Sequence, residues 1–324
     1  MKKLVSVIIP NWNGKHLLED CLNSLKGQTF EYFQTIVVDN GSDDNSVEYI
    51  TNNFPGIKIV KNKKNLGFAR AVNIGVKSYD SKYVVFLNND TLADKNWLKE
   101  LVKTAEEYKE VVSVNSKLVN FYNRRSIDGL GIEINEVGQA RSIGFQKDPN
   151  LFKAPFYIFG ATGGASLFKR DLFLKLGMFD EDFFMYCEEV DFAFRATFLG
   201  YKSIYCPTAL VFHKHKASAN KLPQHVEYWQ FKNMFQVILK NYPTESLVKT
   251  WRWLKIILVY LNTIIYQIKS GFIWPPFATT IWLLFNLPKL IYKRSQIQSN
   301  IKIDLDYLES FLIPKKITFW EILR

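Results

Sequence analysis

Hydrophobic and polar residues alternate in blocks along the first part of the chain. Short, continuous apolar runs are typical of strands that are buried in a parallel sheet, and the stretches between them carry apolar residues at helical spacing. The predicted strands span residues 4–9, 35–38, 57–60, 83–87 and 111–114, and the predicted helices span residues 15–28, 42–53, 68–76 and 96–108. This alternation predicts an α/β fold, a doubly wound sheet with right-handed crossovers.

The alternation of strands and helices is interrupted in the middle of the chain, and the composition becomes apolar and basic near its end. Residues 120–155 are rich in Gly, Asn and charge and predict loops and short hairpins. Further strands are predicted at 165–168, 203–205 and 209–212, with a helix at 184–200. Residues 246–303 contain no Asp or Glu, and basic residues and tryptophans stand among aliphatic runs. We therefore predict an α/β domain over residues 1–240 and a mainly helical, apolar and basic segment over residues 241–324.

The apolar and basic segment predicts contact with a membrane surface. Its longest uncharged stretches, 256–268 and 270–288, fall short of the roughly 20 apolar residues that a spanning helix needs. Aromatic-rich, basic helices of this kind tend to lie in the membrane interface. The alternatives are burial against the α/β domain or a homo-oligomer interface. Nucleic-acid binding is not expected, because the basic residues interleave with aliphatic runs.

Composition and charge indicate the class of protein, its partners and its cellular location. Among 324 residues, 48% are hydrophobic and 23% are charged, which is typical of a packed globular protein. The net charge of +11 favours anionic partners such as acidic lipid headgroups. The apolar run at 4–9 is too short for a signal peptide, and three scattered cysteines argue for a reducing compartment. The expected location is the cytoplasm, peripheral on the inner face of the cell membrane.

Polar clusters follow three of the predicted strands directly. They span residues 10–14, 39–44 and 88–90. One such cluster would be an ordinary turn, because Asn, Asp and Gly favour turns. In open α/β sheets, ligands bind beyond the carboxyl ends of the strands. Three clusters at successive strand ends therefore predict one shared ligand-binding crevice.

Six ordered motifs in this chain resemble those of the family 2 glycosyltransferases. They span residues 7–13, 37–44, 65–69, 163–165, 177–186 and 188–191. The resemblance covers about residues 4–240 and is nearest to the bacterial rhamnosyltransferase-like branch. It implies the nucleotide-diphosphosugar transferase fold, also called the A-type glycosyltransferase fold. It also implies inverting transfer of a sugar, rhamnose or another hexose, from a nucleotide-diphosphate donor. The predicted membrane contact of the C-terminal segment would suit a lipid-linked or polysaccharide acceptor in cell-envelope glycan synthesis.

The resemblance implies roles on the donor side. Asp39 matches the acid that binds the pyrimidine base, although it would also fit an N-cap for a helix beginning near Ser42. Asn65, Gly67 and Arg70 lie where the family closes over the base and the diphosphate, and Arg70 would also fit a solvated helix position. The other residues expected to bind the donor nucleotide are Pro10, Asn11, Asn13 and Asn89.

A divalent metal is expected at the third cluster. Residues 88–90 match the metal motif Asp-x-Asp, of which only the last carboxylate remains. The resemblance makes Asp90 the main ligand to Mg²⁺ or Mn²⁺, with diphosphate oxygens and water in the rest of the shell. His213 matches a second ligand, and imidazole suits Mn²⁺ better than Mg²⁺. A packed strand-end histidine is the alternative for His213, and His215 is a further candidate.

The acidic cluster at 188–191 matches a family motif, Glu-Asp-x-Asp, whose second acid deprotonates the acceptor hydroxyl. The second position here is Glu189, which is one methylene longer than the family residue. Glu188 and Asp191 therefore remain alternatives for the catalytic base. Asp191 would also pair with Arg195 one helical turn later.

Gly163 and Gly164 are expected to allow close approach of the donor sugar or the acceptor. Their glycine-rich run does not follow the first strand, as a dinucleotide-phosphate loop does. Two other functions compete with the transferase. A nucleotidyltransferase would need a Gly-rich, Lys-containing loop after the first strand, which residues 10–14 lack. A catalytically degenerate protein that binds sugar nucleotides or lipids remains the second alternative, because the metal and base motifs both depart from the family pattern.

Overall fold

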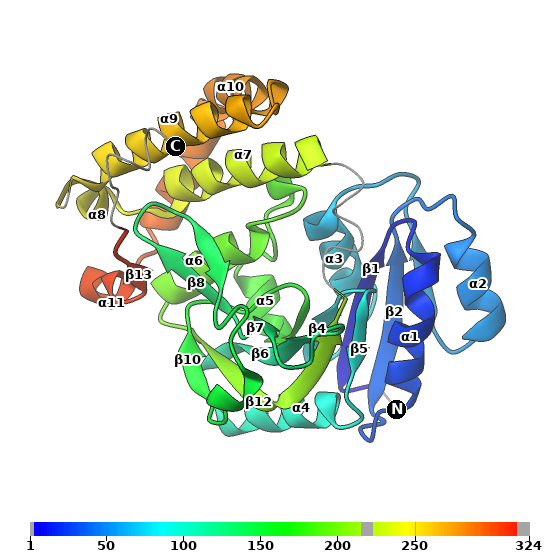
Figure 1. Cartoon of the computed structure of the whole chain (residues 1–324). Coiled ribbons are helices and arrows are strands. Elements are labelled where there is room, and N and C mark those ends of the chain that lie inside the picture. The colour runs from blue at the N-terminus through cyan, green and yellow to red at the C-terminus, as the bar shows by residue number, and fades with distance from the viewer. Residues whose placement is uncertain (1–2, 215–222, 250, 316–324) are drawn as a thin grey trace.

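The computed structural model describes residues 3–214, 223–249 and 251–315. The main sheet has the strand order β10-β12-β6-β11-β4-β1-β2-β3, and β8, β9 and β13 form a small second sheet (Figure 1). The strands are β1 Val5–Asn11, β2 Phe33–Asp39, β3 Lys58–Lys61, β4 Tyr83–Leu87, β5 Thr91–Ala93, β6 Val111–Asn120, β7 Ile127–Gly129, β8 Ile132–Asn135, β9 Ala140–Ser142, β10 Phe156–Ile158, β11 Ala165–Lys169, β12 Lys202–His213 and β13 Leu312–Ile313. The helices are α1 Lys15–Lys26, α2 Ser46–Asn53, α3 Phe68–Lys77, α4 Trp97–Glu107, η1 Pro149–Leu151, α5 Arg170–Lys175, η2 Glu181–Phe183, α6 Glu188–Phe198, α7 Pro223–Asn241, α8 Thr244–Lys249, α9 Arg252–Lys269, α10 Trp274–Gln298 and α11 Leu305–Glu309.

The predicted α/β architecture is confirmed, and its central strands are parallel. β1 pairs with β2 and β4, and β2 pairs with β3, all in parallel register. β11 runs antiparallel between β4 and β6, so the sheet is mixed. Alternate residues of β1 face opposite sides: Val7 packs in a core with α1 and α4, whereas Ile8 packs in a core with α3, α5 and α6. Helices therefore cover both faces and leave the strand ends open for ligands.

Two predicted helices begin later than the sequence indicates. The helix expected at 42–53 begins at Ser46, because the backbone N–H groups of Ser42 and Asp43 bind the side chains of Asp39 and Asn13 instead. The helix expected at 184–200 begins at Glu188. Phe184, Tyr186 and Cys187 before it have positive φ angles, which side chains rarely adopt without tertiary support.

The C-terminal helices share one apolar core with the second half of the α/β domain. Figure 1 shows α7, α9 and α10 stacked as a layer beside α6. The core joins residues from α6, α7, α9, α11 and β13, among them Phe183, Phe194, Phe235, Tyr242, Val259, Leu308 and Leu312. β13 pairs with β8, which ties residues 312–313 to 134–135. The expected boundary between residues 240 and 241 falls in the last turn of α7, inside this core.

α9 and α10 also present apolar side chains to solvent. On α10, Phe277, Ile281, Leu284, Phe285 and Ile291 are all more than half exposed, with Phe285 at 83%. Their spacing places them along one side of the helix, and α9 adds the exposed residues Leu254, Ile257, Leu261, Ile265 and Ile268. We call these residues the apolar face. In the described part of the chain, no helix has the length and apolar character needed to cross a bilayer.

Candidate active site

The first side of the site is a hydrogen-bonded row at the ends of β1, β2 and β4. Parallel pairing sets Asn11 beside Asp39 in register. Asn11 donates to Asp39 over 3.4 Å and accepts from Asn89 over 2.8 Å. Asp39 also accepts from the backbone N–H of Ser42 at 3.1 Å, so the expected capping bond exists but closes a turn rather than a helix. These four residues connect the three predicted clusters.

The segment before α3 closes over this row. Asn65 and Gly67 are held by Asn40, whose amide donates to the Asn65 side chain and to the Gly67 carbonyl. Gly67 has φ +85°, and a Cβ there would lie 2.3 Å from the carbonyl oxygen of Phe184. Only glycine fits this close approach. The backbone N–H of Ala69 donates to the same Phe184 oxygen, so this segment contacts the loop before α6, residues 184–187, which we call the acceptor-side loop after its predicted role.

Three further predicted donor residues have distinct surroundings. Pro10 is half-buried near the end of β1. Asn13 is held by Ser42 and accepts from the backbone N–H of Asp43. Arg70 lies on α3, where its half-exposed guanidinium pairs with Glu181 at 3.4 Å. Arg70 therefore links α3 to the segment that precedes α6.

The candidate metal centre is an aspartate–histidine pair. Antiparallel pairing of β5 with β12 sets His213 beside Thr91, next to Asp90. His213 Nε2 lies 3.1 Å from an oxygen of Asp90, and its Nδ1 hydrogen-bonds the carboxylate of Asp128. Burial alone would lower the pKa of His213, but the hydrogen bonds and charges of both carboxylates raise it to about 10.

This donor set fits a divalent cation that is held largely by a diphosphate. Asp90 and His213 Nε2 offer one oxygen and one nitrogen on one side, as Mn²⁺ or Mg²⁺ with phosphate ligands would need. A carboxylate on the far imidazole nitrogen, as Asp128 provides, is the usual arrangement behind a metal-bound histidine. Among the described residues, no group of three or more acidic, histidine or cysteine side chains is arranged to hold a metal without such a ligand. His215 lies outside the described residues.

The predicted catalytic acids lie at the start of α6, where Glu188 is buried and Glu189 is half-buried. The carboxyl groups of Glu188 and Glu189 are close enough to influence each other's pKa, and the Gly163 backbone is close enough to affect that of Glu189. Burial raises the pKa of Glu188 well above its ordinary value, and the negative charge of Glu189 adds to the rise. Burial also raises the pKa of Glu189, while hydrogen bonds from the backbone and from Glu188 limit the rise. Burial thus favours the protonated form of this pair of carboxyl groups.

Both carboxylates have unused acceptor capacity. Oε2 of Glu188 and Oε2 of Glu189 are buried without a hydrogen-bond partner among the described residues. An unpaired buried oxygen of this kind costs free energy unless a ligand supplies a donor. The surroundings of Gly163 and Gly164 place this pair near the donor side. A Cβ at Gly163 would lie 2.7 Å from the Phe68 ring, and one at Gly164 would lie 3.3 Å from the Asn88 amide.

Asp191 has a different environment from its two neighbours. It is fully buried and accepts hydrogen bonds from Lys240 at 2.7 Å, Asn241 at 2.9 Å and Arg195 at 2.9 Å. Burial would raise its pKa, but the charges of Lys240 and Arg195 lower it below the ordinary value. Both oxygens of its carboxylate are thus paired within an internal network of ions and hydrogen bonds.

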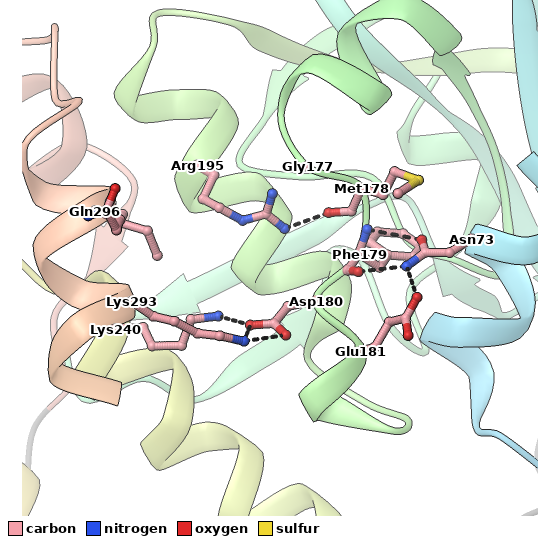
Figure 2. Close-up of a pocket in the computed structure, with 11 residues that line it drawn as sticks. Asn73, Gly177, Met178, Phe179, Asp180, Glu181, Arg195, Lys240, Lys293 and Gln296 are labelled. Atoms are coloured by element: carbon pink, nitrogen blue, oxygen red, sulfur yellow. Dashed lines mark hydrogen bonds and ion pairs between the residues drawn. The ribbon is translucent and has the colours of Figure 1, made fainter. Parts of the chain in front are cut away.

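That network reaches α10 through the segment before α6. Asp180 pairs with Lys240 of α7 at 2.6 Å and with Lys293 of α10 at 2.7 Å. Figure 2 shows both lysines converging on Asp180 beside a cavity of about 430 Å³. On the other side of this cavity, Asn73 of α3 bonds the backbone of Phe179 and the side chain of Glu181 (Figure 2).

One buried amide holds the strained residues that follow. Asn233 of α7 donates to the carbonyl oxygens of Phe183, Met185 and Tyr186, each at 2.8 Å. These residues lead directly into Glu188. Asn233 and Asp128 were not predicted as site residues. The sequence offers little signal for either, because both act on residues far along the chain.

Comparison with known proteins agrees with this geometry. The model of the family described as Glycosyl transferase family 2 matches residues 6–177. The chain is 32% identical over 118 residues to an uncharacterized glycosyltransferase of Haemophilus influenzae, a match that covers 36% of each chain. It is 25% identical over 238 residues to the O-antigen biosynthesis protein RfbC of Myxococcus xanthus, covering 69% of this chain and 18% of that protein. The matched regions thus span only a minor part of both relatives.

A solved structure shares the fold. The crystal structure of GalNAc-T7 with UDP, GalNAc and Mn²⁺ superposes with a TM-score of 0.60 at 15% identity, covering 84% of this chain and 58% of that one. The A-type glycosyltransferase fold that the motifs implied is therefore confirmed. Because the family model spans more than half of the 324 residues, this chain belongs to glycosyl transferase family 2.

Proposed function

We propose that this protein is an inverting glycosyltransferase that moves a hexose, with rhamnose as the leading candidate, from a nucleoside diphosphate to a hydroxyl of a lipid-linked or polysaccharide acceptor. The observation that carries the proposal is the pair Glu188 and Glu189, each with a buried oxygen that has no partner among the described residues, beside the closing segment of a donor-type site. A base near the reacting centre with a raised pKa suits general-base catalysis near neutral pH.

Each part of the site has one task in this reaction. Asp39 accepts a hydrogen bond from an N–H group of the base. Asp90 and His213 would hold Mg²⁺ or Mn²⁺, and the cation would supply positive charge to stabilise the departing diphosphate. Glu189 takes the proton of the acceptor hydroxyl as that oxygen bonds to the anomeric carbon and the carbon–diphosphate bond breaks. Attack opposite the leaving group inverts the configuration, and Glu188 orients Glu189 while keeping its own proton.

We also place this reaction at the inner face of the cell membrane, in cell-envelope glycan synthesis. The exposed apolar residues of α9 and α10 are grouped in one face rather than scattered over the surface. A contiguous apolar patch of this kind usually marks a site that binds a membrane or another protein. Apolar burial would supply most of the membrane affinity, because several basic residues of these helices are already paired: Arg252 with Glu309, Lys289 with Asp182 and Lys293 with Asp180. The relative named for O-antigen biosynthesis supports an envelope role.

A panel of nucleotide sugars tests the proposal. Deoxythymidine-diphosphate rhamnose, UDP-hexoses and GDP-mannose would each be tested for a metal-dependent rise in melting temperature and for slow donor hydrolysis. A donor present at 100 times its Kd stabilises the folded state by about 2.7 kcal/mol. Binding without any hydrolysis or transfer would identify the degenerate binding protein instead, and no binding by any donor would reject both.

A further inference from the structure

A strip of aromatic side chains runs from the acceptor-side loop to the start of α10. The ring of Phe184 stacks on Trp229, with centroids 4.8 Å apart and planes 27° from parallel. Trp229 lies 5.7 Å from His225, which lies 5.2 Å from Trp274. Tyr228 contacts the same Trp274 ring at 5.3 Å. Three elements, the loop before α6, α7 and α10, thus contribute to one strip.

The inner end of the strip lies at the proposed reaction centre. Phe184 comes four residues before Glu188, and its carbonyl contacts Gly67 and Ala69 of the closing segment. Its φ of +61° is strained for a residue with a side chain, and such strain is usually kept where function needs it. Oε2 of Glu188 and Oε2 of Glu189 lie at the start of the helix that this loop enters, and no group in the described part of the chain donates to them.

The outer end of the strip meets the apolar face. Trp274 is 36% exposed, and its neighbours Ile273 and Phe277 are 63% and 58% exposed. His225 is exposed, while Tyr228 and Trp229 are half-buried. The strip is therefore accessible along its length, unlike a set of core aromatics. The strip leads from the strained loop before α6 to the apolar face on α10.

We propose that this strip is the acceptor subsite, and that it binds a lipid-linked sugar. The terminal pyranose ring stacks on the platform of Phe184 and Trp229 with a hydroxyl toward Glu189, and the lipid chain follows Trp274 and Phe277 to the membrane. Sugar rings carry faces of C–H groups, which pack well against the negative faces of aromatic rings. The inference rests on the proposed transferase function, and it adds the class and the direction of the acceptor.

Saturation-transfer NMR on the full chain would test the subsite. The probes are the n-octyl β-glycosides of glucose, galactose, N-acetylglucosamine and rhamnose below their micelle concentrations, with the free sugars and octanol for comparison. We expect saturation at both ring and octyl protons. Trp229→Ala should weaken binding about tenfold, mainly at ring protons, whereas Trp229→Phe should retain most of it. Trp274→Ala should reduce saturation of the octyl protons.

Trp253→Ala is the matched control. It removes an exposed tryptophan at the start of α9, about 20 Å along that helix from Gln267, whose side chain bonds Glu227 next to the strip residues of α7. This variant should change neither binding nor donor hydrolysis. Melting curves would verify that each variant folds. The subsite is wrong if no glycoside transfers saturation at its ring protons, or if the variants at 229 and 253 behave alike. Donor binding by the wild type is measured separately. If donors bind but the glycosides do not, the subsite proposal is rejected and the proposed transferase function is retained.

Discussion

At the residue scale, Asp90 shows how a strand end can be interpreted from sequence alone. It lies three residues after the end of an apolar strand, and its position matched a metal motif. Asp128 could not be predicted in the same way, because it lies in a hairpin whose pairing with β6 the sequence does not specify. Its contact with His213 depends on β12 lying beside β6, which brings together residues 85 positions apart.

We expect that Asp90→Ala abolishes turnover and the metal-dependent part of donor binding. The variant loses the carboxylate that the bound cation would use. Isothermal titration of the donor with Mn²⁺ and with EDTA would measure this, and Asp94→Ala, which removes a nearby carboxylate outside the pair, is the control. Turnover that is unchanged in the presence of EDTA would remove the metal from the mechanism.

We expect that Glu189→Gln lowers kcat by roughly 10²–10⁴-fold while donor binding stays nearly intact, because a lost base affects the chemical step. The pKa of Glu189 is raised, so wild-type kcat should fall as the pH drops through a value above that of an ordinary glutamate. A pH–rate profile measures both. If Glu188→Gln has the larger effect on kcat, the two carboxylates exchange roles.

Glu188 also makes a prediction about stability. The pKa of Glu188 is raised in the folded state. Its contribution to the free energy of unfolding is therefore favourable at low pH and is lost as the pH rises through the folded-state pKa. Glu188→Gln removes this loss. The variant should therefore melt higher than the wild type at pH 8 and nearly the same at pH 4.5. Calorimetry at the two pH values would show it, and a gap that narrows with rising pH would contradict the assignment.

At the element scale, the strands were predictable and the loop before α6 was not. Buried runs such as residues 83–87 identify a strand locally. Residues 184–187 were predicted as helix, yet Asn233 of α7 binds the carbonyl groups of Met185 and Tyr186 and holds them in another conformation. Tertiary contacts override local propensity there. In the same way, residues 203–205 and 209–212 form one strand, β12, with a register shift.

We expect that Asn233→Ala destabilises the protein by about 1–3 kcal/mol, because it removes the donor from three buried carbonyl groups. It should also lower the rate of transfer more than donor binding, since the loop before α6 forms part of the proposed acceptor subsite. Denaturant unfolding and donor titration measure the two effects. Asn286→Ala is the control, because within the described residues its side chain bonds the carbonyl of Trp282, one turn earlier in its own helix. Equal losses in both variants would contradict a specific role for Asn233.

At the scale of the whole molecule, the apolar face predicts membrane binding that depends little on salt. Replacing Leu284 and Phe285 by Asp should move the protein from the pellet to the supernatant in sedimentation with phosphatidylglycerol vesicles, because it places charge in the apolar face. Tyr32→Asp, on an exposed aromatic of the α/β domain, should still pellet. A wild-type protein that stays in the supernatant at low salt would reject the membrane proposal, and analytical ultracentrifugation would then test a homo-oligomer.

The pairing of β13 with β8 has a consequence for synthesis in the cell. The partners lie about 180 residues apart in the chain, and a ribosome adds 5–20 residues each second. Strands β1 to β4 can assemble while the chain is still being made, but the core around α6 stays open for roughly ten seconds or more, until β13 leaves the ribosome. During that interval the apolar side chains of α7 and α9 are unprotected in the nascent chain. This part of the protein is therefore where we expect chaperones to bind and where premature termination would be most damaging.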